Sequence, residues 1–447
     1  MIKIYDTMTR SLRDFVPLTE NVVNMYVCGP TVYNYIHIGN ARSAVAFDTI
    51  RRYFEYCGYT VNYISNFTDV DDKIIKAANE AGISTKELSD KFIAAFMEDT
   101  AQLGIKPATQ NPRVINYMDE IIAFVSTLVD KGFAYVSEGD VYFRVAKSNN
   151  YAKLANKTLE DLEIGASGRT DAETERKENP LDFALWKAAK EGEVSWDSPW
   201  GPGRPGWHIE CSVMATEILG DTIDIHGGGA DLEFPHHTNE IAQSEAKTGK
   251  TFANYWMHNG FVNVDNEKMS KSLGNFVTVH DMLKTVDGQV LRFFLATQQY
   301  RKPINFTEKA IHDAEVNLKY LKNTHSLPLT DQVNQDELQT YLDAFQEAMD
   351  DDFNTANGVT VLFDMAKWIN SGNYDQTVKD VFEKMLQVFG IVFEEEVLDE
   401  DIEKLIEERQ AARANKDFAT ADRIRDELAA QGIKLLDTKE GVRWTRD

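Results

Sequence analysis

The sequence contains little cysteine and no long apolar run. Three cysteines among 447 residues are too few and too scattered for a disulfide framework, which favours a reducing compartment. Charged residues interrupt every apolar stretch before it reaches the roughly 20 residues that cross a bilayer. Residues 1–6 also lack the apolar segment of a signal peptide. We therefore expect a cytoplasmic protein with no membrane partner.

Basic side chains are also in deficit. The chain has 47 Lys and Arg against 72 Asp and Glu, a net charge of -25, which excludes a uniformly basic surface for nucleic acid. The deficit is uneven, because residues 331–400 carry 17 acidic and 3 basic side chains, whereas residues 401–447 carry 11 and 10. We interpret the acidic segment as solvated helical surface. An RNA partner would therefore lie along local basic stripes elsewhere.

A hydrophobic content of 43% and a charged content of 27% are typical of a globular protein, and the length allows about three domains. Two strand-like runs, Val22–Val27 and Tyr59–Ile64, flank a helical pattern at His37–Cys57. This β-α-β order predicts a parallel, doubly wound sheet. Ligands bind at the carboxyl ends of such strands, and both Cys28 and Thr68 follow a predicted strand end.

The later part of the chain changes from strand to helix. The sheet is expected to resume at Gly206–Cys211, which places Cys211 at a strand end, and Asp224–Gly229 is a further predicted strand. The polar stretch Lys157–Asn179 is predicted to be a loop. Amphipathic helices and a small tail module follow. The predicted helices are 308–321, 335–349, 356–370 and 378–388, with two more in 405–430 before a hairpin over 433–445.

Two motifs suit a phosphate-bearing ligand. The first is Lys268-Met269-Ser270-Lys271-Ser272, closed by Gly274, which offers two ammonium groups and two hydroxyls. On its own, such a pentapeptide is most often a solvated surface loop. The second, His37-Ile38-Gly39-Asn40, stands at a predicted strand-to-helix junction. There His37 can donate to a phosphate with the help of the helix dipole, and Gly39 allows a nucleotide to approach the backbone. The alternative interpretation of His37 is a helix cap or a buried structural histidine.

Possible metal ligands form another group. Cys28, Cys211, His236 and Glu240 offer two thiolates, an imidazole and a carboxylate, a set that suits Zn²⁺. Because His236 and Glu240 are four residues apart, a helix would place both on one face. The ligands are far apart in sequence and no C-x-x-C is present, so buried apolar cysteines remain the alternative interpretation.

Together these motifs resemble those of a known family. The motifs at His37 and Lys268 resemble the HIGH and KMSKS signatures of class I aminoacyl-tRNA synthetases, and the possible metal ligands resemble those of the cysteinyl-tRNA synthetases in that class. Asn40 stands where the first signature has histidine, which puts a charged role there in doubt. The resemblance runs essentially from end to end. It implies an α/β, Rossmann-like class I catalytic domain with a parallel sheet and an insertion, then a helical bundle and a small α+β anticodon-binding domain.

The resemblance also implies domain boundaries and a reaction. The implied reaction activates L-cysteine with ATP and Mg²⁺ to cysteinyl-adenylate and pyrophosphate, and then transfers cysteine to the 3′ end of tRNA(Cys). We expect the enzyme to be a monomer. The implied segments are the first half of the catalytic domain at 1–110, a connective insertion at 111–200, the second half at 201–260, the KMSKS loop and stem-contact region at 261–310, the helical bundle at 311–395 and the anticodon-binding domain at 401–447.

Individual residues take roles from the same resemblance. One zinc ion per chain, held by Cys28, Cys211, His236 and Glu240, would read the substrate thiol, because zinc with soft ligands favours a thiolate over the hydroxyl of serine. The implied catalytic residues are His37, Lys268 and Lys271. The implied ATP-binding residues are Pro30, His37, Gly39, Asn40, Lys268, Met269, Ser270, Lys271 and Ser272; the implied cysteine pocket is Thr31, Thr68, Trp207 and His226; and the candidate tRNA contacts are Arg443 and Trp444.

Two other functions stay open at this point. A cysteine ligase with a sugar-amine acceptor, as in mycothiol synthesis, would share the adenylation site and the zinc, but the base-rich tail at 401–447 argues for tRNA. A non-catalytic RNA-binding relative would not need His37 and Lys271, and both are intact. For Trp444, packing on the tail helices is as good an interpretation as stacking on an unpaired base.

Overall fold

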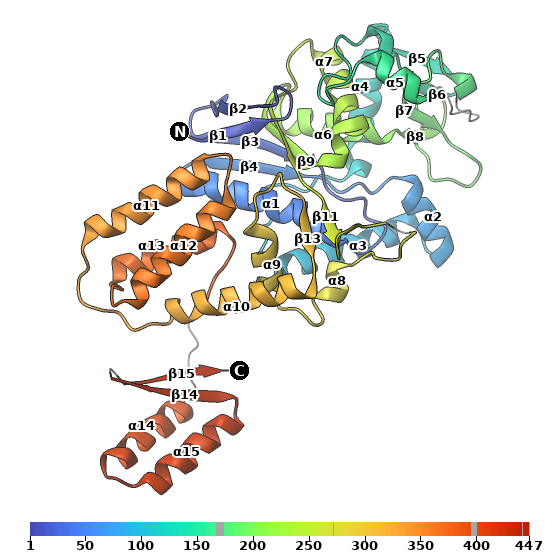
Figure 1. The fold of residues 1–447 in the computed structure, drawn as a ribbon. Helices are drawn as coiled ribbons and strands as arrows, with labels where there is room; N and C mark the ends of the chain where they lie inside the picture. Colours follow the sequence, from blue (N-terminus) through green and yellow to red (C-terminus); the bar gives the residue numbers. More distant parts are fainter. Residues whose placement is uncertain (167–173, 271, 395–399, 440, 447) are drawn as a thin grey trace. The chain divides into compact units, whose positions relative to one another are not determined.

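The computed structural model describes residues 1–447 apart from 167–173, 271, 395–399, 440 and 447 (Figure 1). The chain divides into two compact units, Met1–Val392 and Phe393–Asp447. Among the helices of the described residues, none combines the length and the apolar character needed to span a bilayer.

Unit 1 is built on a four-stranded parallel sheet with the order β10-β9-β3-β4. The strands are β3 (Val22–Val27), β4 (Thr60–Ser65), β9 (Ile223–Gly229) and β10 (Ala253–Asn259). Strand β4, the next strand of this sheet in the sequence, pairs with one edge of β3, and the later strand β9 pairs with the other edge. The order of the strands therefore reverses between β3 and β9, which is where parallel sheets bind ligands. The predicted doubly wound sheet is confirmed.

Helix α1 (Ile38–Tyr56) connects β3 to β4 and confirms the helix predicted at His37–Cys57. His37 and Asn40 form a reciprocal cap: His37 Nδ1 accepts from the Asn40 N–H, and Asn40 Oδ1 accepts from the His37 N–H, both at 3.1 Å. This arrangement satisfies two backbone donors that a helix start leaves open. Asn40 therefore has a structural role as part of the helix cap, and this role requires no charge.

The insertion between the two halves of the sheet has its own antiparallel sheet and covering helix. It contains α4 (Met118–Asp130) and the strands β5 (Ala134–Ser137), β6 (Asp140–Phe143), β7 (Phe183–Ala188) and β8 (Gly203–Pro205). The loop expected at Lys157–Asn179 is wrong in part, because α5 (Leu159–Ala166) lies within it. The sequence did not predict this helix because the surrounding stretch is polar and the helix itself contains only short apolar segments.

The strand expected at Gly206–Cys211 is also wrong. Helix α6 (Trp207–Leu219) begins there, and Cys211 lies in its second turn rather than at a strand end. All residues from Ile209 to Thr216 are buried, so the helix is covered on every side and shows no 3.6-residue alternation. A short, continuously buried segment of this kind, with no clear alternation of polar and apolar residues, cannot be distinguished from a buried strand by periodicity.

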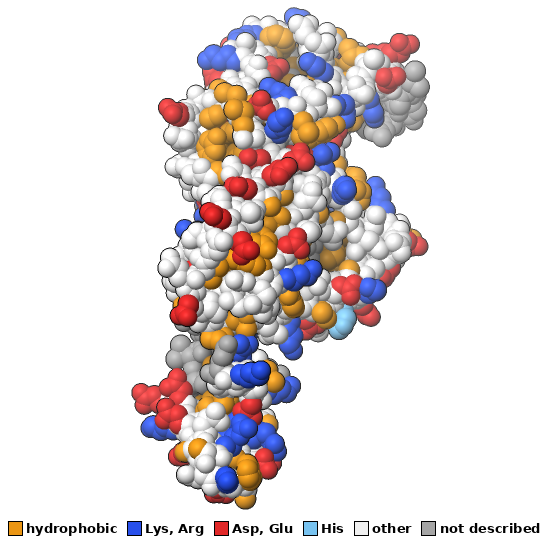
Figure 2. All heavy atoms as spheres, turned by 60° about the vertical axis from the view of Figure 1, so that its left-hand side comes forward, with side chains coloured by type: hydrophobic (Ala, Val, Ile, Leu, Met, Phe, Trp, Pro, Cys, Tyr) orange, Lys and Arg blue, Asp and Glu red, His pale blue; other side chains and the backbone are white. Residues whose placement is uncertain are grey.

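The rest of unit 1 is mainly helical, as predicted. Acidic residues of these helices, such as Asp336, Glu337 and Asp343, are exposed, as expected of solvated helical surface, and acidic side chains are spread over the face in Figure 2. The main helices are α9 (Gly288–Ala296), α10 (Glu308–His325), α11 (Gln335–Asp350), α12 (Thr355–Asn370) and α13 (Gln376–Val388).

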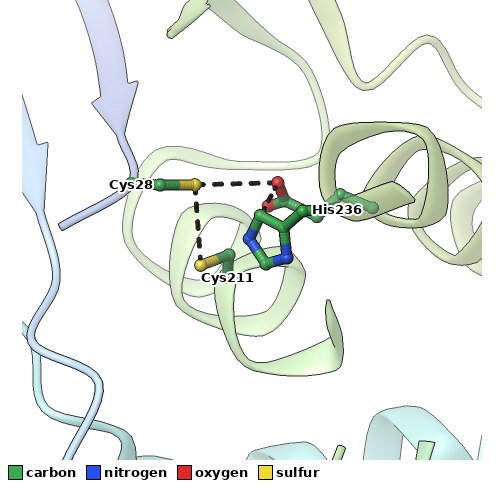
Figure 3. Close-up of side chains that lie close together, drawn as sticks. Cys28, Cys211 and His236 are labelled. Atoms are coloured by element: carbon green, nitrogen blue, oxygen red, sulfur yellow. Dashed lines mark hydrogen bonds and ion pairs between the residues drawn. The ribbon is translucent and has the colours of Figure 1, made fainter. Parts of the chain in front are cut away.

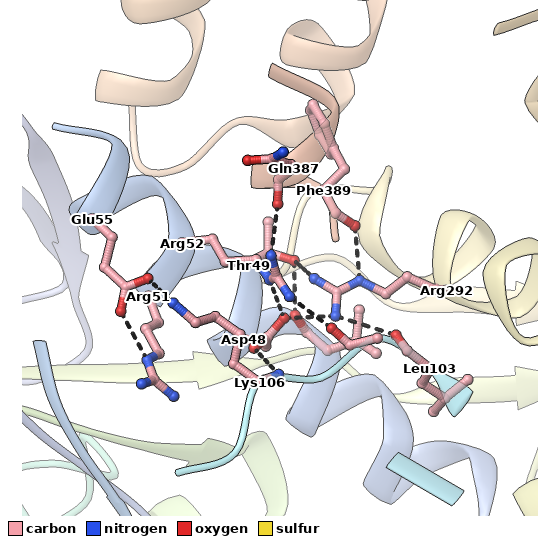
Figure 4. A network of polar contacts seen from close by, with 12 residues as sticks. Asp48, Thr49, Arg51, Arg52, Glu55, Leu103, Lys106, Arg292, Gln387 and Phe389 are labelled. Carbon is pink, nitrogen blue, oxygen red and sulfur yellow. Dashed lines mark hydrogen bonds and ion pairs between the residues drawn. The ribbon is translucent and has the colours of Figure 1, made fainter. Parts of the chain in front are cut away.

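A buried polar network joins α1 to these helices (Figure 4). Asp48 Oδ2 accepts from Arg292 on α9 at 2.6 Å and from Arg52 at 2.8 Å. Arg292 Nε also donates to the Phe389 carbonyl at 2.8 Å, and Arg52 donates to the Gln387 carbonyl at 3.0 Å. Both carbonyls lie at the end of α13. The helix that begins at His37 is therefore fixed to the helical part of the unit by paired charges.

Unit 2 consists of two helices and a hairpin, which confirms the predicted tail elements. Its core contains Ile402, Ile424, Leu428 and Ile433. Arg409 donates to both carboxylate oxygens of Asp437, each at 2.9 Å, and so links the first helix to the hairpin. The elements are α14 (Glu400–Ala414), α15 (Phe418–Ala430), β14 (Ile433–Thr438) and β15 (Gly441–Arg446).

Candidate active site and metal centre

A cleft of about 990 Å³ lies at the point where the strand order of unit 1 reverses. Its walls come from the segment after β3, the start of α1, the loop after β9 and the loop over residues 268–274, which we call the Lys/Ser loop. A cleft of this size accommodates a nucleotide with a small substrate. The predicted site residues that line it are Cys28, Pro30, Thr31, His37, Gly39, Asn40, Trp207, Lys268 and Met269.

The two predicted phosphate-binding motifs meet in this cleft. The Ile38 N–H donates to the Val277 carbonyl and the Val279 N–H donates to the Ile36 carbonyl, both at 3.0 Å. The segment after the Lys/Ser loop is thereby hydrogen-bonded to the segment around His37. A Cβ on Gly39 would lie 2.9 Å from the His37 ring and 3.5 Å from the Met269 methyl carbon. Gly39 therefore lets the two motifs come into contact.

The Lys/Ser loop is closed by its own polar groups. The Ser270 N–H donates to Asn275 Oδ1 at 2.9 Å, and the hydroxyls of Ser270 and Ser272 are 3.2 Å apart. The ammonium of Lys268, at the end of β12 (Glu267–Lys268), lies 5.6 Å from the ring centroid of Phe261. Lys271 lies outside the described residues, so its predicted role stays a prediction. The described part of the loop holds Lys268 at the cleft.

His37 is partly buried at the base of the cleft. Burial lowers its pKa, the nearby Asp231 carboxylate opposes this, and the Lys73 ammonium lowers it further. Its Nδ1 is occupied by the helix cap, which leaves Nε2 as the ring atom available to a ligand. A neutral imidazole in this state donates from Nε2. Asp231 and Lys73 also line the cleft, and our sequence analysis identified neither of them.

The four possible metal ligands converge beside the cleft (Figure 3). Cys28 Sγ lies 3.7 Å from Cys211 Sγ and 3.7 Å from Glu240 Oε2, and His236 Nε2 lies 3.6 Å from the same carboxylate oxygen. All four ligand atoms are within 4.8 Å of one another. Bonds of about 2.0–2.3 Å to a tetrahedral zinc ion separate neighbouring ligand atoms by roughly 3.3–3.8 Å. The donor set and its spacing therefore fit Zn²⁺.

The neighbours of His236 hold it in the state that a metal ligand requires. Its Nδ1 lies 2.9 Å from His208 Nδ1, and Trp207 stacks on its ring with centroids 4.1 Å apart. Its Nε2 is buried without a hydrogen-bond partner among the described residues. Burial lowers the pKa of His236 well below its ordinary value, and His208 and His226 lower it further, so the ring is neutral. A hydrogen bond to the other ring nitrogen is the usual way in which a metal-binding histidine is oriented.

Ionised forms of Cys28 and Glu240 would be energetically unfavourable at this buried site without a cation. Burial raises the pKa of Cys28 well above its ordinary value, and Cys211 and Glu240 raise it further. Burial likewise raises the pKa of Glu240 well above its ordinary value. A bound divalent cation reverses this preference, because it favours the deprotonated ligands.

Other histidines surround the cluster. His237 Nε2 lies 3.4 Å from Cys28 Sγ, and its Nδ1 lies 2.8 Å from His258 Nε2. His226 Nε2 lies 3.1 Å from Glu240 Oε1. Cys28, His226, His237 and Glu240 thus form an overlapping second group of possible ligands. His208 and His258 were missed in the sequence, because only the fold reveals their pairing.

The residues predicted for the cysteine pocket occupy different depths. Thr31 and Trp207 line the cleft, and Trp207 is 40% exposed, so its stacked ring forms a wall between the solvent and His236. Thr68 is buried, and its hydroxyl accepts from Asn66 Nδ2 at 3.1 Å. His226 is fully buried behind Glu240 and does not line the cleft. The structure thus brings Thr31 and Trp207 to the cleft, with Thr68 and His226 behind them.

In unit 2, the two candidate tRNA contacts lie on opposite faces of the hairpin. Trp444 is paired with Leu435, and both pack on the core of the unit. Arg443 is paired with Leu436, whose side chain is exposed, so this pair faces away from the core. The packing interpretation of Trp444 therefore accounts for its position.

Comparison with known proteins agrees with this arrangement. The family model described as "tRNA synthetases class I (C) catalytic domain" matches residues 14–316, a "DALR domain" matches 344–394, and a "Cysteinyl-tRNA ligase anticodon binding domain" matches 395–444. Among solved structures, the chain is similar to methionyl-tRNA synthetase of Mycobacterium tuberculosis, with a TM-score of 0.60 and 15% identity over 82% of this chain and 89% of that chain. At that identity the likeness concerns the fold alone.

The sequence relatives are much closer. The chain is 95% identical to a cysteine–tRNA ligase of Streptococcus thermophilus, 83% identical to one of Streptococcus pyogenes and 82% identical to one of Streptococcus agalactiae. Each match covers 100% of both chains. The alternative with a sugar-amine acceptor is not favoured by these findings. The chain belongs to the cysteine–tRNA ligase family of class I aminoacyl-tRNA synthetases.

Proposed function

We propose that this chain activates L-cysteine with ATP at the cleft of unit 1 and transfers it to tRNA(Cys), with a zinc ion as the reader of the substrate thiol. The observation that carries the proposal is the convergence of Cys28, Cys211, His236 and Glu240 beside a cleft that both signature motifs line. Membership of the family supports the reaction. The positions of the metal cluster and of the two signature motifs support separate roles for them, the first in reading the thiol and the second in binding ATP.

In this proposal, the chain's own residues position the reactants and stabilise charge. His37 donates from Nε2 to a phosphate of ATP, and the start of α1 adds its backbone dipole. Lys268 and Lys271 hold the phosphates that depart as pyrophosphate, whose negative charge grows as the bond breaks. Pro30, Gly39, Asn40 and the rest of the Lys/Ser loop shape the nucleotide site. Mg²⁺ accompanies the ATP phosphates.

The cysteine substrate is proposed to lie between Thr31 and Trp207, with its thiol toward the metal cluster. Zinc, when bound, supplies a soft Lewis acid that favours a thiolate over the hydroxyl of serine and lowers the pKa of the thiol. Thr68 and His226 support the pocket from behind. Trp207 limits access of water to the thiol end, because its ring lies between His236 and the cleft.

Unit 2 is proposed to bind the anticodon region of tRNA(Cys). The match over 395–444 and the nearly balanced charge of this unit support that role. Arg443 is the better of the two candidate contacts, because it faces away from the core on which Trp444 packs. We also propose that the enzyme acts as a cytoplasmic monomer, and that the segments at 1–110, 111–200, 201–260, 261–310, 311–395 and 401–447 act as separate functional parts.

The decisive experiment measures three activities of the purified chain. Cysteine-dependent exchange of pyrophosphate into ATP tests activation, charging of tRNA(Cys) tests transfer, and the same exchange with serine tests thiol reading. We expect the first two to be robust and the third to be at least about 10⁴-fold weaker. Exchange without charging would contradict the tRNA assignment, and comparable exchange with serine would contradict thiol reading.

A further inference from the structure

One cationic side chain of the cleft has no role in the reaction as described above. Lys73 lies in the first turn of α2 (Asp72–Ala81) and lines the cleft together with Tyr33. Its ammonium lies 5.6 Å from the centroid of the Tyr33 ring. Among the residues that the structure describes, no carboxylate lies within 4.0 Å of this ammonium. Lys73 thus presents an unneutralised charge to a cleft that would receive a polyanion.

The acidic residues next to Lys73 in sequence have other partners. The Asp72 carboxylate contacts the guanidinium of Arg204 and lies 3.8 Å from the Lys187 ammonium, both on the insertion. The Asp71 side chain caps α2 by accepting from the Lys73 N–H at 2.8 Å. These contacts hold the first turn of α2 in place. They orient the acids toward the insertion and the helix backbone rather than toward the Lys73 ammonium.

Lys73 has a counterpart on the Lys/Ser loop. Lys268 also lines the cleft, and its ammonium lies over the ring of Phe261, again at 5.6 Å from the centroid. Each lysine therefore rests on an aromatic ring, a weak contact that a phosphate can replace with a charge-assisted hydrogen bond. His37 lies in the same cleft and is close enough to Lys73 for the ammonium to influence its charge state. Two ammonium groups and one imidazole thus line one cleft, which the Asp231 carboxylate also lines.

We propose that Lys73 is a phosphate ligand that binds the α-phosphoryl group of ATP while the adenylate forms. This inference rests on the proposed function. α2 begins directly after the segment that contains Thr68, on the side assigned to cysteine, whereas Lys268 lies on the loop assigned to the leaving pyrophosphate. Lys73 is therefore at the end of the triphosphate that cysteine attacks.

The role of Lys73 is electrostatic, and it transfers no proton. A carboxylate oxygen of cysteine forms a bond to the α-phosphorus. The bond from that phosphorus to the oxygen that bridges it to the β-phosphate breaks, and its electron pair leaves with pyrophosphate. The Lys73 ammonium donates a hydrogen bond to a non-bridging oxygen of the α-phosphoryl group, where negative charge increases in the transition state.

The test is Lys73→Met, which keeps the stem and removes the charge, with Lys76→Met as the matched control. Lys76 is exposed on the same helix, lies 4.0 Å from Glu80 and does not line the cleft. In cysteine-dependent pyrophosphate exchange, Lys73→Met should lower kcat/KM for ATP by about 10- to 100-fold, with little change in KM for cysteine. Lys73→Arg should recover part of the loss. Thermal unfolding and zinc content should equal those of the control.

Two results would overturn the inference. The first is exchange by Lys73→Met at the rate of Lys76→Met, while the wild-type chain is active. The second is intact exchange with a loss confined to single-turnover transfer from preformed cysteinyl-adenylate, which would make Lys73 a ligand of a tRNA phosphate instead. Failure of the proposed function gives a different result, because the wild-type chain itself would then show no cysteine-dependent exchange.

Discussion

His37 and Thr278 pair in an antiparallel bridge, which joins the residue that caps α1 to the segment that follows the Lys/Ser loop. The far end of the loop is thereby held by backbone hydrogen bonds on both sides of this pair. The near end belongs to β12, which pairs with β11 (Val262–Val264). Backbone pairing therefore holds both ends of the loop and keeps its base aligned with His37.

The first prediction concerns the metal cluster. The purified chain should contain about one zinc ion, and Cys211→Ser should lower both the zinc content and cysteine-dependent pyrophosphate exchange, by about 100-fold for exchange. The reason is the convergence of Cys211 with Cys28 and Glu240 on one point. Metal analysis and exchange assays would be made on the same preparations.

Cys57→Ser is the control for this prediction. Cys57 is a free cysteine that caps the end of α1 and is exposed, so its replacement should change neither quantity. An equal loss of zinc content and of pyrophosphate exchange in Cys211→Ser and Cys57→Ser would indicate a general effect of thiol removal. Full exchange by metal-free protein would rule out the reading of the thiol by zinc.

The second prediction concerns Lys268. Lys268→Met should slow pyrophosphate exchange by about 100-fold, mostly in kcat, because its contacts with the phosphates strengthen as charge develops. Lys284→Met is the control, since Lys284 is exposed two residues after the end of α8 (Val279–Met282) and its ammonium pairs with Asp281 at 2.8 Å. Rapid-quench measurement of the first turnover would separate chemistry from product release. Equal first-turnover rates in both variants would assign Lys268 to a surface role.

The third prediction is a pH dependence of stability that arises from Asp48. Burial alone would raise its pKa, but the guanidiniums of Arg292 and Arg52 outweigh burial and hold the pKa below its ordinary value. A carboxyl of this kind adds stability that is fully present above the unfolded pKa of about 3.9, and this contribution is lost as the pH falls through the folded value. Asp48→Asn should therefore cost about 3 kcal/mol at pH 7, because it leaves Arg292 buried without its charge partner.

The difference between the wild-type chain and Asp48→Asn should narrow as the pH falls from 5 to 3. Thermal unfolding midpoints of the two proteins at each pH would measure it. Asp281→Asn serves as the control, since Asp281 is exposed and its pair with Lys284 is surrounded by water. A difference that stays constant over this range would show that Asp48 contributes by packing rather than by charge.

Local patterns predicted much of the fold. Helix α1 and strand β3 were predicted to within about one residue, because the apolar residues of α1 recur at helical spacing over 19 residues and β3 is a short, β-prone run that ends before Cys28. Helix α6 was mistaken for a strand because the segment around Cys211 is short and buried on every side, so that no periodic pattern marked it as a helix. The element around Cys211 was therefore wrong, although Cys211 itself was named as a ligand from the family resemblance.

Only part of the candidate site could be predicted, because some of its residues are close in sequence and others meet only in the tertiary fold. His236 and Glu240 are four residues apart, so local geometry brings them together, whereas Cys28 and Cys211 are joined only by the tertiary fold. His208 and His258 orient the histidines of the cluster through contacts between separate elements. Lys73 has no motif around it, and only its position at the cleft reveals it. The spacing of residues in the sequence carries no information about contacts between separate elements or about a position at the cleft.

The last prediction concerns unit 2. A chain that ends at Val392 retains every residue of the cleft and the metal cluster, and it forms a compact unit by itself. It should therefore keep cysteine-dependent pyrophosphate exchange within about threefold of the full chain. Charging of tRNA(Cys) should fall by at least about tenfold, because the contacts to the anticodon region are lost.

A point variant separates contact from folding in the same unit. Arg443→Gln changes a side chain on the face opposite the core and should weaken charging, with an effect that diminishes at high salt as the electrostatic contribution is screened. Trp444→Ala should instead lower the unfolding midpoint of unit 2, because Trp444 packs on the core that contains Ile424 and Leu428. Undiminished charging by the chain that ends at Val392 would show that unit 2 does not bind tRNA, and the acceptor would then have to be recognised by unit 1 alone.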